Sequence, residues 1–344
     1  MAIALLSCSP DSRSLPNETS RQERSLSQSK ELARKANRVV MGWNAFGTTE
    51  TYIRQNSVSP HLNVVSPGWF SLERDRLVAS DVDPRYVHWA HESGKQVWPL
   101  FGNRFDSELT DAILSDPTKR QKVIDYVAKA LVTNNMDGIN VDFENIDIKN
   151  KDQYVSFIRQ LQERLHPHGI LVSVDVTREN PDPFWSGSFD RRGLGKAADY
   201  IVMMGYDEDL GGGGKIGSVS SLPWVEEGVR LLLKDVPARK IILAVPFYTR
   251  DWMTDLNTGK VAQSADLTLT EVESVIAAKR LVKKWDPRTK QNYVEYSEKG
   301  LKHQIWVEDE QSLKRRLDLV DKYKLKGMAI WYIGQEPLDI WQVF

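Results

Sequence analysis

Residues 137–144 read Asp-Gly-Ile-Asn-Val-Asp-Phe-Glu, and this octapeptide decides the fold. In an extended strand, alternate side chains point to the same face. The polar face carries Gly138, Asn140, Asp142 and Glu144, and the apolar face carries Ile139, Val141 and Phe143. A surface strand whose acids meet water is the alternative, but the apolar face and the flanking Met136 indicate burial. Because buried carboxylates without partners are unfavourable, we expect this strand to build a functional site.

The chain around this strand alternates between short apolar runs and helical patterns from about residue 36 onward. This rhythm is typical of βα units around a parallel sheet. Eight such runs predict a closed (β/α)8 TIM barrel rather than an open sheet. The candidate strands are Arg38–Trp43, Leu62–Ser66, Gln96–Phe101, Gly138–Glu144, Leu171–Val176, Tyr200–Tyr206, Ile241–Phe247 and Met328–Tyr332.

Two intervening helices are marked by apolar stripes at helical spacing. The first stripe consists of Tyr154, Phe157, Ile158, Leu161 and Leu165, and Pro167 with Gly169 ends that helix. The second helix spans Pro117–Leu131, with a stripe of Val123, Tyr126, Val127 and Ala130.

The last two candidate strands are separated by far more chain than one helix needs. Within the gap, Gln291–Tyr296 and His303–Glu308 alternate as strands, and Gln311–Tyr323 returns as a helix. We therefore predict a small α+β insertion at 251–309 within a barrel domain at 36–344. Because loops at that end of a barrel form the active-site rim, the insertion should be one wall of a cleft.

Composition limits the functions that the chain can have. Its 344 residues carry 46 Lys+Arg against 47 Asp+Glu, which gives no electrostatic reason to expect nucleic-acid binding. Eleven Trp and eleven Tyr suit a sugar-binding cleft, although ordinary packing is the competing explanation. The pairs His88/His91 and His166/His168 lack the i,i+4 spacing of a helical zinc site. We expect no metal and no cofactor, and a monomer.

The first eight residues, MAIALLSC, end in Leu5-Leu6-Ser7-Cys8, which resembles the lipobox of bacterial lipoproteins. The apolar stretch is too short to span a membrane, and the usual basic n-region is missing. Coincidence is therefore the alternative to lipidation at Cys8. Residues 9–34 are rich in Ser, Arg, Glu and Gln, and we interpret 1–35 as a lipoprotein signal remnant with a disordered tether. This predicts a bacterial, extracytoplasmic protein whose only membrane contact is through Cys8.

The octapeptide is similar to the DGxDxDxE signature of glycoside hydrolase family 18, the chitinase-like enzymes. Met204-Gly-Tyr206-Asp207 resembles the MxYD element of that family, Pro246-Phe-Tyr248-Thr-Arg250 resembles its seventh-strand motif, and Trp331 occupies its eighth-strand tryptophan position. The resemblance covers about residues 36–344. Segments such as SVDVT (173–177) and IWVEDE (305–310) are most similar to the subgroup of bacterial spore-germination and cell-wall hydrolases.

The resemblance implies a substrate-assisted, retaining glycosidase mechanism. Glu144 would be the acid/base, and Asp142 would orient the sugar's N-acetyl group, whose oxygen attacks the anomeric carbon. Tyr206 would hydrogen-bond the acetamide. Substrate contacts are expected from Asp207, Met204, Tyr248, Arg250, Trp331 and Trp43, and supporting roles from Asn140 and Asp137. For Arg250, a structural ion pair is the competing interpretation.

Two positions depart from the family pattern. Asn140 stands where the family usually has Asp, so one charge is removed, while its NH2 group can still donate to Asp142. We expect less upward pressure on the pKa of Glu144 and an acid-shifted activity profile. Trp98-Pro-Leu-Phe-Gly102 lacks the SxGG element of chitinases proper, which argues against polymeric chitin.

Three functions remain open at this point. The leading one is a β-N-acetylglucosaminidase that acts on peptidoglycan or spore cortex, with a 2-acetamido glycan as its only partner. The second is a chitinase or chito-oligosaccharide hydrolase with the same catalytic residues. The third is a non-catalytic glycan-binding protein, which the presence of both Glu144 and Asp142 disfavours. Gly211–Gly214 superficially suggests a phosphate loop, but no Gly-Lys-Ser/Thr follows it.

Overall fold

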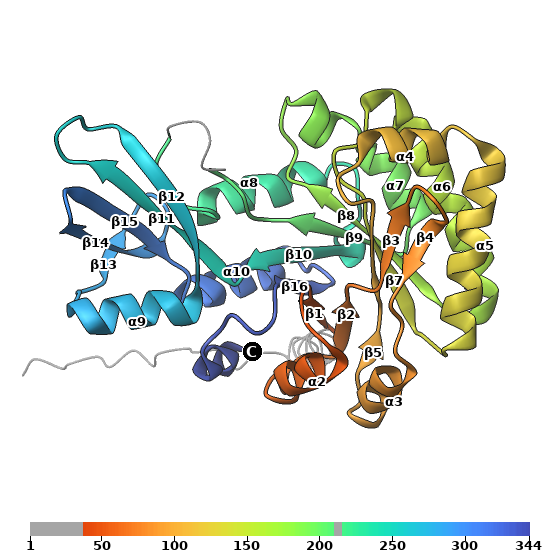
Figure 1. Ribbon diagram of the computed structural model, residues 1–344, viewed down its shortest axis with the longest axis horizontal. Helices are drawn as coiled ribbons and strands as arrows, with labels where there is room; N and C mark the ends of the chain where they lie inside the picture. Colours follow the sequence, from red (N-terminus) through yellow and green to blue (C-terminus); the bar gives the residue numbers. More distant parts are fainter. Residues whose placement is uncertain (1–36, 210–214) are drawn as a thin grey trace, which may run out of the picture. The chain divides into compact units, whose positions relative to one another are not determined.

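The strand β7 (Gly138–Asp142) lies within an eleven-stranded sheet, between β6 (Leu100–Gly102) and β8 (Leu171–Thr177), and pairs in parallel with both (Figure 1). The structure is a computed structural model that describes residues 37–209 and 215–344. Cys8 and the predicted tether lie outside these residues, as does Gly211–Gly214. Residues Val39–Phe344 form one unit.

The sheet closes into a barrel through a single run of chain. The short strand β5 (Gln96–Val97) pairs with β2 (Val64–Pro67), and β6, which follows after Trp98 and Pro99, pairs with β7. The backbone amide of Asp137 donates to the carbonyl of Val97 at 3.2 Å. The segment from β5 to β6 therefore bonds to β2 on one side and to β7 on the other, so the sheet has the topology of an α/β barrel.

The eight predicted barrel strands are found with ends that agree to within two residues, but the predicted strand Gln96–Phe101 is divided into β5 and β6. Besides those above they are β1 (Val39–Asn44), β9 (Tyr200–Met204), β10 (Ile241–Pro246) and β16 (Gly327–Trp331). The hairpin of β3 (Phe70–Glu73) and β4 (Leu77–Ser80) extends the sheet beside β6 and was not expected.

Helices cover the outside of the barrel (Figure 1). They are α2 (Thr49–Ser57), α3 (Pro84–Glu92), α4 (Ser107–Leu114), α5 (Pro117–Thr133), α6 (Lys151–Leu165), α7 (Arg191–Ala197), α8 (Leu222–Leu232) and α10 (Glu310–Lys322). Short 3₁₀ segments occupy Ile148–Asn150, His166–His168, Ala238–Lys240 and Leu338–Val343, and a π segment occupies Pro183–Gly187. No helix in the described part of the chain is long and apolar enough to cross a membrane.

The apolar stripe of α6 is confirmed, because all five predicted residues are buried. The stripe predicted for α5 is wrong at Tyr126, which is 47% exposed. The buried side chains of α5 are Val123, Ile124, Val127, Ala128 and Leu131. A helix has 3.6 residues per turn, so Tyr126, two positions after the buried Ile124, lies on the other side of the helix from it.

The insertion between β10 and β16 is a five-stranded sheet with one helix. Its elements are β11 (Tyr248–Asp255), β12 (Val261–Thr268), α9 (Leu269–Lys279), β13 (Lys284–Asp286), β14 (Gln291–Glu298) and β15 (Leu301–Val307). Val272 of α9 packs with Val294, Ile305 and Val307 of the sheet. Because β11 begins two residues after β10 ends, the barrel strand leads directly into this sheet.

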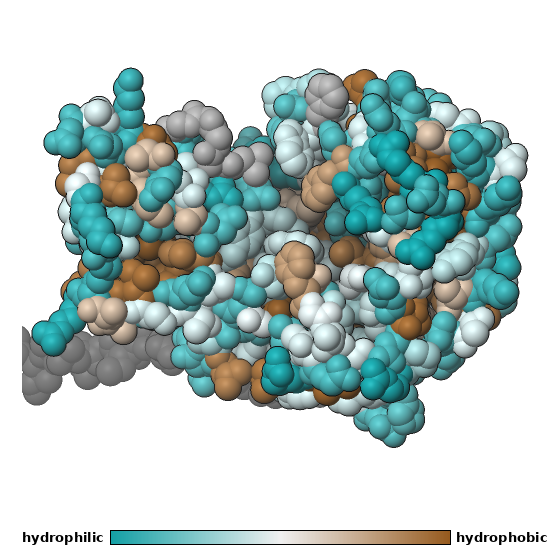
Figure 2. All heavy atoms as spheres, viewed as in Figure 1, coloured by the Kyte–Doolittle hydropathy of each residue, from teal (hydrophilic) through white to brown (hydrophobic). Residues whose placement is uncertain are grey.

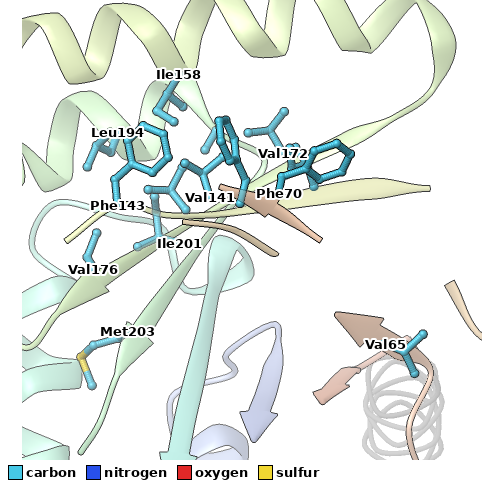
Figure 3. Packing of buried hydrophobic residues seen from close by; sticks show 14 of the residues in the cluster. Val65, Phe70, Val141, Phe143, Ile158, Val172, Val176, Leu194, Ile201 and Met203 are labelled. Atoms are coloured by element: carbon cyan, nitrogen blue, oxygen red, sulfur yellow. The ribbon is translucent and has the colours of Figure 1, made fainter. Parts of the chain in front are cut away.

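The two faces of β7 belong to different cores, as the alternation of its sequence predicts. Val141 and Phe143 pack outward, with Ile158 of α6 and Leu194 of α7 (Figure 3). The inner face points into the barrel, where Trp43, Trp98 and other side chains form a second cluster. On the face shown in Figure 2, hydrophobic residues are scattered in small groups among hydrophilic ones.

Gly138 tests how tightly the barrel interior is packed. A methyl group at this position would lie 2.7 Å from Cδ1 of the buried Trp98, whose ring stacks on Tyr200. We expect Gly138→Ala to lower the free energy of unfolding by about 1–3 kcal/mol through overpacking. Urea denaturation of the variant and of Gly68→Ala, where a methyl group would make only ordinary contacts, measures the difference. Equal stabilities of the two variants would contradict the packing argument.

Candidate active site

The end of β7 is anchored to the neighbouring loop by one asparagine. The backbone amide of Glu144 donates to Oδ1 of Asn103 at 3.0 Å, and Nδ2 of Asn103 donates back to the carbonyl of Glu144 at 2.7 Å. Asn103, which is buried, also donates to Oγ1 of Thr110 at 2.8 Å. Asn103 therefore fixes the backbone from which the Glu144 side chain projects, a role that sequence reasoning missed.

The carboxyl ends of neighbouring strands bring further polar side chains to Asp142 and Glu144. Asp175 comes from β8, and Tyr206 follows β9. In a parallel barrel these ends lie on the same side, and the pKa of Tyr206 is raised by burial and by the charges of Asp175 and Asp142. The structure thus places Tyr206 with the predicted carboxylates and adds Asp175.

Asn140 has a different set of partners from the one expected. Its Oδ1 accepts from Nε1 of Trp43 at 2.7 Å, and its Nδ2 donates to Oγ of Ser173 at 3.1 Å and to Oδ1 of Asp175 at 2.7 Å. Both amide hydrogens are engaged across to β8, so the expected donation to Asp142 is wrong. The amide group of Asn140 therefore bonds to the neighbouring strand β8 rather than to Asp142 on its own strand.

The three carboxyl groups have elevated pKa values because they share one buried region. Burial raises the pKa of Asp142. Burial, followed by the charges of Asp142 and Asp207, raises the pKa of Glu144. Burial and the charge of Asp142 raise the pKa of Asp175, which the hydrogen bond from Asn140 lowers in part. Since these groups interact, they titrate as a unit, and the arrangement favours a protonated acid near neutral pH.

Asp142 also holds a buried acceptor with no partner. Its Oδ1 has no hydrogen-bond donor among the described residues. Such groups are uncommon in folded proteins and call for an explanation. An acceptor of this kind, beside a protonated acid, suits a ligand that brings its own N–H or O–H group.

The seventh-strand motif supplies the partner of Asp207. The hydroxyl of Tyr248, on β11, donates to Oδ1 of Asp207. Burial raises the pKa of Asp207, and this hydrogen bond and the charge of Arg250 lower it. Arg250 is buried and donates from Nε to Oδ1 of Asp266 at 2.7 Å. The ion pair, which was the competing interpretation for Arg250, is therefore present, and the charge of Arg250 also acts on Asp207.

Two residues that we expected in the site lie elsewhere. Trp43 is only 1% exposed, donates to Asn140, and meets the ring of Trp331 edge-on at 5.7 Å between centroids. It supports those two side chains and cannot contact a sugar. Asp137 precedes β7, where Oδ2 accepts from the amide of Val97 at 2.8 Å. Because the strand rises about 3.3 Å per residue, Asp137 is at the opposite end of β7 from Glu144.

A cavity of about 260 Å3 opens beside Glu144. Its lining comprises Glu144, Thr177, Arg178, Asn180, Trp185, Met204, Tyr206, Asp207, Glu208 and Trp224. Met204, Tyr206 and Asp207 were expected there, whereas Arg178, Trp185 and Trp224 were not. Within residues 37–209 and 215–344, no three His, Cys, Asp or Glu side chains are placed to hold a metal ion.

Comparison with known proteins identifies the family to which the chain belongs. Residues 84–336 match the model of glycosyl hydrolases family 18. The chain belongs to this family. The protein is accordingly a glycosidase.

The relatives include several Bacillus proteins. An uncharacterized glycosylase, YvbX, of Bacillus subtilis is 24% identical over 90% of this chain and 91% of its own. A cortical fragment-lytic enzyme of Bacillus cereus is 24% identical over 83% of this chain and 68% of its own. The crystal structure of the spore cortex-lytic enzyme SleL of Bacillus megaterium superposes with a TM-score of 0.79 at 22% identity, covering 89% of this chain and 73% of that one. At that identity the superposition shows a shared fold.

The raised pKa of Glu144 predicts a pH-dependent stability. The folded state binds the Glu144 proton more tightly than the unfolded chain does, in which the pKa of Glu144 is near 4.5. The stability that this group contributes is therefore present below pH 4.5 and is lost as pH rises toward the folded pKa. We expect the stability gain of Glu144→Gln over the wild type to grow by more than about 1 kcal/mol between about pH 4.5 and pH 8.

Urea unfolding across that pH range measures this difference. Glu163→Gln is the matched control, because Glu163 is exposed on α6. The control measures the effect of the same substitution at an exposed position. A pH dependence for Glu144→Gln no larger than that of the control would show that burial does not perturb the Glu144 carboxyl group.

Proposed function

We propose that the protein hydrolyses β-linked N-acetylglucosamine glycans of peptidoglycan or spore cortex, by retaining, substrate-assisted catalysis with Glu144 as acid/base. One observation carries the proposal. Glu144 and Asp142 stand side by side at the end of β7, both buried enough to raise their pKa values. A glycosidase needs one carboxyl group that is still protonated at working pH to donate to the leaving oxygen.

Asp142 and Tyr206 would hold the acetamide group of the substrate. The unpartnered Oδ1 of Asp142 is a buried acceptor for the acetamide N–H. Burial raises the pKa of Tyr206, so its hydroxyl keeps its proton and can donate to the acetamide oxygen. Held in this way, the acetamide oxygen attacks the anomeric carbon while Glu144 protonates the departing oxygen. Water then opens the cyclic intermediate, with Glu144 as the base.

The choice of glycan rests on the relatives and on one departure from the family pattern. A cortical fragment-lytic enzyme and a spore cortex-lytic enzyme are both similar to this chain. Residues Trp98–Gly102 lack the motif of chitinases proper, which disfavours polymeric chitin. Product release from purified sacculi and from chitin oligomers distinguishes the two substrates, and mass spectrometry of the released muropeptides identifies the bond that is cut.

The cellular location follows from the substrate. A wall glycan lies outside the cytoplasm, so we propose an extracytoplasmic or spore-associated bacterial protein. Lipidation at Cys8 stays a prediction, since that residue is outside the described chain. Labelling with a radioactive fatty acid, compared between the wild type and Cys8→Ala, tests it.

Removal of the acid provides the direct test of the mechanism. We expect Glu144→Gln to lower kcat on a 2-acetamido glycan by at least about 10²- to 10⁴-fold, because the leaving oxygen loses its proton donor. Binding of the glycan, measured by calorimetry, should persist. Hydrolysis should also require the acetyl group. Equal wild-type rates on acetylated and N-deacetylated glycans would exclude substrate assistance, and a wild type inactive on every 2-acetamido glycan would favour a binding protein.

Asn140 is expected to set the basic limb of the activity profile. Asn140→Asp keeps the acceptor for Trp43 but places a second carboxyl group next to Asp175, where the amide now donates at 2.7 Å. Two such groups share one proton, so a negative charge is added near Glu144 and raises its pKa. We expect the basic limb of the kcat/KM profile to move to higher pH than in the wild type. Asn134→Asp, at the end of α5, is the control, and an unshifted limb in Asn140→Asp would refute this role.

A further inference from the structure

The cavity beside Glu144 has one basic residue, Arg178, among the described residues that line it. Arg178 follows directly after β8 and is largely buried, with 13% of its side chain exposed. The proposed acid–base chemistry does not use it. A buried guanidinium within a catalytic cavity is a natural partner for an anionic group of a ligand.

Neighbouring groups hold the guanidinium rigidly. Nε donates to the carbonyl of Trp224 at 3.0 Å, Nη1 donates to the carbonyl of Glu179 at 3.0 Å, and Nη2 pairs with Glu227. The group also lies 4.9 Å from the centroid of the Trp224 ring. A guanidinium has five N–H donors, so these three bonds leave two for a ligand.

The packing of α8 leaves room for the arginine stem. A methyl group at Gly228 would lie 2.8 Å from Cγ of Arg178. The glycine therefore lets the helix approach the loop after β8 while the stem passes between them. Arg178 is thus placed in the cavity by backbone contacts on both sides, which is the preorganisation that specific binding requires.

The charges in the cavity favour an anion at this position. Burial raises the pKa values of Glu144, Asp207 and Glu208, which favours their neutral forms. Glu227, the ionic partner of Arg178, has 64% of its side chain exposed, so water screens that pair. Arg178 is consequently the basic group, among the described lining residues, that an anionic part of a ligand would meet.

The cavity is lined both by Tyr206, the proposed partner of the attacked sugar's acetamide, and by Arg178 and Trp224, beside which the leaving sugar would lie. Trp331, from which a substrate contact is also expected, comes from β16 and is not part of the lining. The acid protonates the oxygen that joins the attacked sugar to the leaving sugar. Because Glu144 is at the cavity wall, the leaving sugar would occupy the cavity with Arg178.

We propose that Arg178 binds the lactyl carboxylate of an N-acetylmuramic acid residue on the leaving side of the cleaved bond. This inference rests on the proposed function and specifies its substrate. In N-acetylmuramic acid the lactyl ether is on C3, next to the C4 oxygen that leaves, so its carboxylate lies close to Glu144. The carboxylate is free only where no peptide is attached, and an amide-hydrolysing reaction must therefore supply the substrate.

The experiment compares three glycans on the full chain. They are peptide-free GlcNAc–MurNAc strands with free carboxylates, the same strands with the carboxylates converted to methyl amides, and tetra-N-acetylchitotetraose. For the wild type we expect kcat/KM on the charged strand to exceed that on the amidated strand by about 10- to 100-fold, since a hydrogen bond to a charged group supplies a difference of this order. In Arg178→Gln this ratio should fall to about one.

Two further variants distinguish carboxylate binding by Arg178 from a purely structural role of this residue. Arg192→Gln is the matched control, because Arg192 pairs with Asp235 on the exposed surface of the barrel, and it should keep the wild-type ratio. Glu227→Gln removes the competing carboxylate and should lower KM on the charged strand alone. A wild-type ratio near one, or an equal loss on all three glycans in Arg178→Gln with no selective effect of Glu227→Gln, would overturn the proposal.

A binding measurement keeps this test independent of turnover. Calorimetry with Glu144→Gln gives the affinities for the charged and amidated strands without hydrolysis. A preference for the charged strand that disappears when Arg178→Gln is added supports Arg178 as the carboxylate site even if the wild type hydrolyses neither strand, in which case the proposed function fails alone. Hydrolysis without any preference would leave the proposed function standing and exclude the role of Arg178.

Discussion

The burial of carboxyl groups at the mouth of the barrel is the constraint on which the site depends. The apolar face of β7 packs between sheet and helices, so the opposite face must point into the barrel and bring Asp142 with it. At that depth the ionised form of a carboxyl group is poorly solvated, which raises the pKa values of Asp142 and Glu144. The packing that stabilises the barrel therefore also favours the protonated form of Glu144.

Asparagine side chains hold this region together without adding charge. Asn140 links Trp43, Ser173 and Asp175 across three strands, and Asn103 binds both backbone groups of Glu144. Each amide offers both donors and acceptors, so one side chain satisfies several buried groups. With Asp at position 140, one of these contacts would join two acceptors and would need a shared proton. The departure from the family pattern thus has a local electrostatic consequence rather than a steric one.

The sequence was sufficient for the barrel but not for the whole site. Period-two alternation found β7 and its polar face, and the same rule applied to Ser173, Asp175 and Thr177 would have found Asp175. Local patterns could not show that Asn140 turns toward β8, because a hydrogen bond between strands depends on their register. Trp43 and Asp137 were misplaced for a related reason: a residue type suited to sugar contact or support does not reveal which end or depth of the barrel it occupies. Arg178 and Trp185 come from a loop whose course no periodicity fixes.

The Asp142 oxygen that has no donor among the described residues bears on both stability and the proposed substrate. Leaving a buried acceptor without a donor costs about 1–3 kcal/mol for a typical group. A ligand that supplies the missing N–H recovers this free energy on binding, and a sugar without an acetamide does not. Under the proposed mechanism, selectivity for 2-acetamido sugars would arise partly from this difference, and replacing Asp142 with a well-packed apolar residue would remove it. Burial of the same carboxyl group would thus be unfavourable for folding and useful for recognition.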